Sequence, residues 1–461
     1  MSIIAAFMVP HPPMIVPEVG RGSENQVEKT IKAYEKVADE IAALKPETII
    51  ISSPHSIMYS DYFHISPGAG ARGSFADFGA PQVKFDLDYD EELVKLICAR
   101  ADASHFPAGT LGEKRPELDH GTMVPLWFVT KKYKDFKLVR TGLSGYDLLK
   151  HYEYGMMIKD AVESLERRIV YIASGDLSHK LQDYGPYGFA EEGPVYDKRI
   201  MDVCSGGRFG ELFDFDENFC EKAAECGHKS FVIMAGALDG RAVEATQYSH
   251  EDVTGVGYGI CSFVPKGDDE GRHFLDKRLK LVENELLEKS SKSDVYVKLA
   301  RASAEYFVKN GDVMPLPENV APALLNTKAG AFVSIHKFGA LRGCIGTIAS
   351  TQKNLALEII ENAVSAVSKD PRFQPVTEDE LKYLDINVDV LGEAEKISSP
   401  AELDVKKYGV IVQSGYKRGL LLPDLDGVDT VEQQVSIARR KGGIGPGEDV
   451  ELFRFEVVRH Y

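Results

Sequence analysis

Three short runs rich in Ile and Val place the strongest limit on how this chain folds. They are residues 3–9 (IIAAFMV), 48–53 (TIIISS) and 168–173 (RIVYIA). Each has the length of one strand, and continuous apolar runs of this kind are typical of strands in a sheet that is covered on both faces. The runs therefore predict buried strands in such a sheet.

A helical pattern fills the segment between the first two runs. In residues 23–44 (SENQVEKTIKAYEKVADEIAAL) apolar side chains recur at helical spacing, and Ser23 or Asn25 is placed to cap the helix. Residues 156–166 (MMIKDAVESLE) repeat the pattern before the third run. Strand, helix and strand form a βαβ unit. We therefore predict an α/β fold in which an N-terminal domain has a central, mostly parallel sheet flanked by helices.

The composition changes near residue 265, where the chain becomes highly charged. We predict an N-terminal domain over residues 1–265, a charged linker over 266–290 and a second domain over 291–461. The second domain has a helical pattern at 294–310, followed by strand-like runs at 331–336, 386–391, 408–413 and 453–458. This mixture predicts a smaller C-terminal α+β domain.

Net charge and cysteine usage narrow the class of protein. The formal net charge of −17 argues against nucleic-acid and anionic-membrane partners, because phosphate binding needs a basic surface. No run approaches the roughly 20 apolar residues that cross a bilayer, and no signal-peptide pattern is present. The six cysteines include no CxxC pair, so reduced thiols in the cytoplasm are the expectation.

Three histidines follow the three predicted strands. His11 comes after the first run, His55 after the second and His179 after the third. Ligands of open α/β sheets bind at the carboxyl ends of the strands, so these side chains are expected to converge on one crevice. His120 stands at the predicted start of a helix, within reach of the same crevice.

Two imidazoles and one carboxylate on one face of an ion form the facial triad of non-haem Fe(II) oxygenases. His11 and His55 are candidates for the imidazoles. Glu225, just before an apolar helical segment, is a candidate for the carboxylate. Its neighbours Cys226 and His228 are also metal-capable, so the third ligand stays open at this point.

Six motifs occur in an order that resembles the class III extradiol dioxygenase superfamily, the LigB-like proteins. They are HPP at 11–13, SPHS at 53–56, GSFADFGAP at 73–81, LDHGTMVPL at 118–126, SGDLSH at 174–179 and AAECGHKSF at 223–231. Together they cover roughly residues 1–265.

The resemblance implies a site and a reaction. His11, His55 and Glu225 would bind Fe(II), with His179 as general base and His120 as proton donor in the ring opening of a catechol-type aromatic substrate. A histidine suits this work because its pKa lies near neutral pH. Two His and one Glu also suit catalytic zinc, which is the alternative metal.

The related Memo proteins imply an alternative third ligand and an alternative function. In these proteins a cysteine of a similar CG stretch lies at the metal site, which makes Cys226 the rival of Glu225. The corresponding alternative function is a metal-binding assembly protein without dioxygenase activity of its own.

The second part resembles the AMMECR family over about residues 290–461. The matching motifs are LRGCIGT at 341–347, KDPRFQPVTEDEL at 369–381 and YKRGLLLPD at 416–424. The candidate cleft residues are Arg342, Cys344, Arg372 and Lys441. A neighbouring cation would lower the pKa of the Cys344 thiol. The alternative for Cys344 is a small buried side chain, and the alternative for Arg372 is an ion pair with Asp370 or a neighbouring glutamate.

The two parts together resemble the AmmeMemoRadiSam arrangement. That resemblance implies a radical-SAM protein as partner. Because this chain has no CxxxCxxC cluster, the partner would be a separate protein. A homo-oligomer is compatible with the sequence.

Overall fold

The structure is a computed structural model and describes residues 3–425 and 427–461. The chain forms two compact units, Met1–Arg278 and Leu279–Tyr461, and each is described by itself. The division falls inside helix α9 (Phe274–Lys292), so much of the segment expected to be a linker is helical.

A six-stranded sheet forms the centre of the first unit, in the order β7-β2-β8-β1-β10-β9. The first four strands of this order are parallel to one another. Strand β10 pairs antiparallel with β1, and β9 pairs antiparallel with β10. The three predicted strands are present to within one residue at each end. The bounds are β1 Ile3–Val9, β2 Thr48–Ser52, β7 Lys137–Thr141, β8 Ile169–Ser174, β9 Arg241–Glu251 and β10 Tyr258–Asp268.

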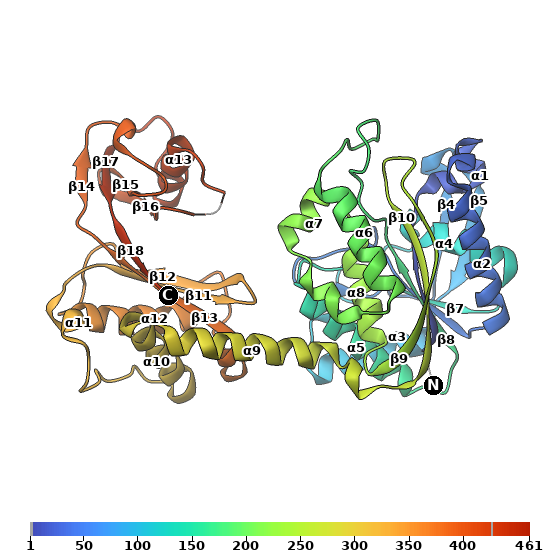
Figure 1. The fold of residues 1–461 in the computed structure, drawn as a ribbon, viewed down its shortest axis with the longest axis horizontal. Coiled ribbons are helices and arrows are strands. Elements are labelled where there is room, and N and C mark those ends of the chain that lie inside the picture. The colour runs from blue at the N-terminus through green and yellow to red at the C-terminus, as the bar shows by residue number, and fades with distance from the viewer. Residues whose placement is uncertain (1–2, 426) are drawn as a thin grey trace. The chain divides into compact units, whose positions relative to one another are not determined.

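Helices cover both faces of this sheet, as expected (Figure 1). Alternate strand residues such as Phe7 and Ile51 share a core with α2 (Glu28–Leu44) and α4 (His120–Lys132). Ser52 points to the other face, where its hydroxyl lies 2.7 Å from that of Ser230 in α8 (His228–Ala237). Helix α8 packs against α5 (Leu148–Glu163) on that face.

The start of α2 differs from the expectation. Ser23–Val27 forms a separate 3-10 helix, and neither Ser23 nor Asn25 caps the α-helix. Instead the carboxylate of Glu251 accepts both the backbone N–H and the hydroxyl of Thr30, each at 2.7 Å. A side chain from a distant strand thus satisfies a free donor of the first turn, which a local sequence pattern cannot reveal.

The remaining elements of the first unit connect and cover the sheet. The hairpin β4–β5 is bound to the loop before α4, because the Leu118 N–H donates to the Arg72 carbonyl at 2.7 Å. The bounds are α1 Pro17–Gly20, β3 Phe63–His64, β4 Gly70–Phe75, β5 Ala80–Asp88, α3 Glu91–Ala103, β6 Ala108–Gly109, α6 Glu192–Ser205 and α7 Glu217–Ala223.

The second unit has two antiparallel sheets, in the orders β12-β11-β13-β18 and β14-β17-β15-β16. Helices α10 and α12 pack against the first sheet and α13 against the second. The helix bounds are α10 Val295–Asn310, α11 Pro322–Asn326, α12 Leu355–Ser368 and α13 Val431–Lys441. The strand bounds are β11 Ala331–Lys337, β12 Ala340–Gly346, β13 Leu384–Leu391, β14 Glu395–Ile397, β15 Gly409–Ser414, β16 Lys417–Leu421, β17 Glu451–Phe455 and β18 Val457–His460.

One predicted strand of this unit is wrong. Residues 453–458 belong to two strands, since β17 pairs with β14 and β15 whereas β18 pairs with β13 in the other sheet. The chain changes sheet at Glu456, and an apolar run does not record which sheet it joins. Among the described residues, no helix combines the length and the apolar character needed to cross a membrane.

Candidate metal centre

Three neighbouring strand ends carry the histidines of the first unit. Val9 of β1 pairs with Ser174 of β8, and Ser52 of β2 pairs with Ala173 of the same strand. The carboxyl ends of β1, β2 and β8 are therefore level, and the loops that follow begin at one edge of the sheet. The Nε2 atoms of His11 and His55 lie 3.0 Å apart there.

Two hydrogen bonds fix His11 in place. It is only 2% exposed, and its backbone N–H donates to Asp176 Oδ1 at 2.7 Å. Its Nδ1 lies 3.0 Å from Ser174 Oγ, whose own hydrogen goes to the Gly121 carbonyl at 2.5 Å. Nδ1 is then the donor, and Nε2 presents its lone pair to the crevice. Burial and the nearby His55 lower the pKa of His11 to about 3, so the ring is neutral at pH 7.

Cys226 supplies the third metal-capable atom. Its Sγ lies 3.6 Å from His11 Nε2 and accepts the Asp176 N–H at 3.3 Å. The ligand atoms of His11, His55 and Cys226 all lie within 4.8 Å of one another. Burial raises the pKa of the Cys226 thiol well above its ordinary value, so the metal-free side chain is protonated. An incoming cation would displace that proton.

Two glycines allow Cys226 to approach the strand ends. A Cβ on Gly175 would lie 2.1 Å from the Cα of Gly227, far inside van der Waals contact. The loop after β8 and the turn before α8 therefore touch through bare backbone. This contact sets the distance between Asp176 and Cys226.

Glu225 and His228 take other roles. The carboxylate of Glu225 accepts the His228 N–H at 2.6 Å, at the start of α8, where free backbone donors favour a carboxylate. The ring of His228 lies 2.9 Å from the Leu212 carbonyl and 3.3 Å from the Tyr196 hydroxyl. Among the described residues, the metal-capable groups contain Cys226 and neither Glu225 nor His228. Burial raises the pKa of Glu225 to about 7.

His120 borders both the histidine cluster and an open cleft. Its ring centroid lies 4.0 Å from that of His55 and 5.4 Å from that of Phe78, whose ring is steeply inclined to it. The cleft measures about 700 Å³ and extends beneath the β4–β5 hairpin, with Phe85 and Met123 also in its wall. Burial and the neighbouring histidines lower the pKa of His120 to about 3. It is therefore neutral at pH 7 and must gain a proton before it can donate one.

His179 lies next to Asp176 and close to Cys226. Its Nε2 is buried without a hydrogen-bond partner and lies 4.0 Å from Asp176 Oδ2. Asp176, His179 and Cys226 form a second group whose ligand atoms lie within 4.8 Å of one another. Burial raises the pKa of Asp176 to about 6. The sequence reasoning overlooked Asp176, although it follows a strand end and precedes His179 by three residues.

Asp119 stands at the predicted helix start, and the structure gives it a positioning role that the sequence did not reveal. Its carboxylate accepts the hydroxyls of Ser53 and Ser56 at 2.6 and 2.9 Å, which fixes the loop that carries His55. The same carboxylate caps α4 by accepting the Thr122 N–H at 2.9 Å. Asp119 therefore positions two histidines without entering the metal-capable group.

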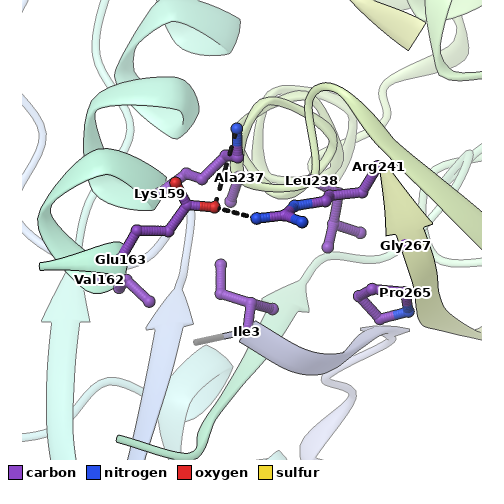
Figure 2. A pocket seen from close by; sticks show the side chains of 9 residues that line it. All are labelled: Ile3, Lys159, Val162, Glu163, Ala237, Leu238, Arg241, Pro265 and Gly267. Atoms are coloured by element: carbon purple, nitrogen blue, oxygen red, sulfur yellow. Dashed lines mark hydrogen bonds and ion pairs between the residues drawn. The ribbon is translucent and has the colours of Figure 1, made fainter. Parts of the chain in front are cut away.

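A small pocket lies at the other end of β1, beside Ile3 (Figure 2). Glu163 crosses it, with Oε1 2.5 Å from Arg241 Nη2 and 3.9 Å from Lys159 Nζ. Its charged groups are paired with one another, and its lining contains no histidine or cysteine. We interpret it as a structural ion-pair cluster.

In the second unit, three of the four candidate residues lie together. The Cys344 N–H donates to Asp370 Oδ2 at 2.9 Å, and Arg372 pairs with the same carboxylate at 2.7 Å. Arg342 pairs with Glu380 at 2.8 Å. Both arginines thus have carboxylate partners. For Arg372 this is the ion pair with Asp370 that the sequence offered as the alternative to a cleft role.

Lys441 is the fourth candidate and is placed differently. It is the exposed last residue of α13, which packs on β15 and β16 of the second sheet. The other three candidates lie on β12 of the first sheet and on the loop after α12. Among the described contacts, none joins Lys441 to them.

Comparison with protein families decides the relationship. Residues 5–261 match the family described as the catalytic LigB subunit of aromatic ring-opening dioxygenase. The chain belongs to the LigB family. Residues 297–460 of this LigB-family chain match the AMMECR1 family, so a LigB domain is fused to an AMMECR1 domain.

Relatives exist over the full length and over parts of it. A Clostridium acetobutylicum protein is 41% identical over 468 residues, covering 100% of this chain and 99% of the relative. A Thermotoga maritima protein is 52% identical over 167 residues, covering 36% of this chain and 96% of the relative. An uncharacterised Pyrococcus horikoshii protein of known structure matches with 30% identity and a TM-score of 0.34, over 36% of this chain and 88% of that chain.

Proposed function

We propose that the LigB domain is an Fe(II)-dependent oxidoreductase that opens the ring of a catechol-type aromatic. The observation that carries the proposal is the meeting of His11 Nε2, His55 Nε2 and Cys226 Sγ within 4.8 Å at the carboxyl edge of the sheet. The geometry supports Cys226 as the third ligand, in the role that the resemblance assigns to Glu225. Imidazole and thiolate donors both suit iron and zinc.

The donor set fits a metal ion. His11 Nδ1 donates its hydrogen to Ser174 Oγ, so Nε2 carries a lone pair that can accept a proton or bind a cation. Three protein ligands leave coordination positions for a chelating substrate. When bound, Fe(II) supplies the electronic connection between a catechol and O2, whose direct reaction is spin-forbidden.

The surrounding residues supply proton transfer and orientation. His179 has a buried Nε2 with no partner, and burial lowers its pKa, so it is a neutral base suited to take a catechol proton. His120 is neutral as well and donates only after it has received a proton. Phe78 stands beside His120 at the cleft, where a planar ring can pack against it.

Turnover with catechols is the test. Fe(II)-loaded protein is incubated in air with a panel of catechols, and O2 uptake and the yellow ring-opened product are followed. We expect turnover in the wild type, loss of turnover in His179→Gln and wild-type turnover in His105→Asn, which removes a histidine on a surface turn outside the crevice. Bound iron without any turnover would refute the dioxygenase proposal.

A second candidate function is favoured by the thiol in the donor set. A cysteine in place of a carboxylate is the feature that the Memo relatives share, and these imply a metal-holding module that works with a separate radical-SAM partner. Isolation of the native complex tests this candidate. A stable partner together with absent oxygen chemistry would favour it, and metal analysis after anaerobic purification separates iron from zinc.

A further inference from the structure

We infer that the crevice binds a second divalent cation through Asp176, His179 and Cys226, and that this cation blocks the proposed base. The inference rests on the proposed function in one respect, because it shares Cys226 with the first ion. The two three-residue groups meet at that sulfur, so a single thiolate would bridge two adjacent cations.

The separations in this group suit a cation. His179 Nε2 and Asp176 Oδ2 lie 4.0 Å apart, which is too far for a hydrogen bond. Two ligand atoms of a tetrahedral ion with bonds of about 2 Å lie roughly 3.3 Å apart, so the two side chains would close by less than about 1 Å on binding. The Cys226 sulfur lies within 4.8 Å of both atoms. Metal–thiolate bonds are about 2.3 Å long, so only a small adjustment closes the site.

The described hydrogen bonds leave Asp176 Oδ2 and His179 Nε2 free. Asp176 uses Oδ1 to accept the His11 N–H, and Oδ2 is the atom that faces His179. His179 Nε2 is buried without a partner, although buried polar atoms are usually satisfied. A cation between these two atoms would give the unpartnered nitrogen its missing interaction.

The loop that carries His179 is fixed before any ion arrives. The His179 N–H donates to the Ala223 carbonyl at 3.2 Å, and the Ser178 hydroxyl donates to the same carbonyl at 2.7 Å. The Ser178 N–H donates to Asp197 at 2.8 Å. These bonds tie the loop to the end of α7 and to α6, so a cation finds the ring already aimed at Asp176.

The donor set indicates the class of cation. One carboxylate, one imidazole and one thiolate give two negative charges and mixed hard and soft atoms. Such a set suits Zn(II) or Co(II) and disfavours Mg(II) and Ca(II), which select oxygen ligands. Once bound, the cation occupies the lone pair of His179 Nε2, and that nitrogen can no longer take a substrate proton.

Zn(II) stoichiometry tests the inference on the full-length protein. Metal-free protein is equilibrated with Zn(II), and bound metal is counted by native mass spectrometry and elemental analysis. We expect two ions per chain in the wild type, one in His179→Gln and two in His120→Gln, which removes a neighbouring histidine outside the group. Circular dichroism checks that each variant is folded. One ion in the wild type, or two in His179→Gln, would overturn the inference.

Failure of this inference can be told apart from failure of the proposed function. The metal count uses neither catechol nor O2. Turnover by a protein that binds one ion keeps the function and rejects the second site, whereas two ions without turnover support the second site and reject the function. Where both hold, adding Zn(II) to the Fe(II)-loaded protein suppresses turnover as the second ion binds.

Discussion

Replacing Cys226 with serine is expected to weaken the binding of the first metal ion by about 100- to 1000-fold. Structural zinc sites with four ligands have apparent binding free energies of about 10–16 kcal/mol, or about 2.5–4 kcal/mol for each ligand. In the proposed site Cys226 supplies one of three protein ligands, and a serine hydroxyl is a much poorer donor. A loss of about 3 kcal/mol corresponds to about two powers of ten in affinity.

The matched control is Glu225→Gln, one residue away. Glutamine retains an oxygen that can accept the His228 N–H, so α8 keeps its cap. We expect its metal affinity to stay within about tenfold of the wild type, a change below 1.4 kcal/mol. Anaerobic competition with a chromogenic chelator measures both variants. A larger loss in Glu225→Gln than in Cys226→Ser would refute the reasoning and restore Glu225 as the ligand.

Three further predictions follow from the described contacts. Metal affinity should rise about tenfold per pH unit between about pH 6 and 8, because Cys226 releases one proton when the metal binds. His11, with a pKa of about 3, releases none. A flat pH profile in competition titrations would contradict this. Gly175→Ala places a Cβ 2.1 Å from facing backbone and should lower the free energy of unfolding in urea by at least about 1–3 kcal/mol, together with metal affinity; an unchanged midpoint would disprove the close contact. Burial raises the pKa of Glu380, but hydrogen bonds from Arg342, a backbone N–H and a lysine outweigh it and lower the pKa to about 2. The ionised Glu380 side chain stabilises the fold by up to about 3 kcal/mol above its unfolded-state pKa near 4.5, and this stabilisation is lost as the pH falls toward 2. The loss of unfolding free energy caused by Glu380→Gln should therefore be smaller at pH 3 than at pH 7. An equal loss at both pH values would count against this ion pair.

The core of the fold was predictable because its signals are local. The runs at 3–9, 48–53 and 168–173 are short and rich in Ile and Val, and runs of this length and composition are typical of covered strands. Features that depend on distant partners were not predictable. The cap of α2 comes from Glu251, more than 200 residues further along the chain, and the run at 453–458 divides between two sheets.

The site was predictable in part for the same reason. His11 and His55 follow strand ends, so the topology alone brings them together. The proposed choice of Cys226 over Glu225 depends on the start of α8, where the backbone N–H of His228 donates to the carboxylate while the thiol lies near His11 and His55. Sequence reasoning could not weigh that competition, although Asp176 carried a readable signal in its position after a strand.

X-ray absorption at the iron edge tests the central claim most directly, because it reports the atoms bound to the metal. For Fe(II)-loaded full-length protein we expect nitrogen scatterers together with one sulfur scatterer at about 2.3 Å, the length of a metal–thiolate bond. The sulfur signal should disappear in Cys226→Ser and persist in Glu225→Gln. A shell of nitrogen and oxygen atoms alone in the wild type would contradict the assignment of Cys226, with His11 and His55, as the metal ligands.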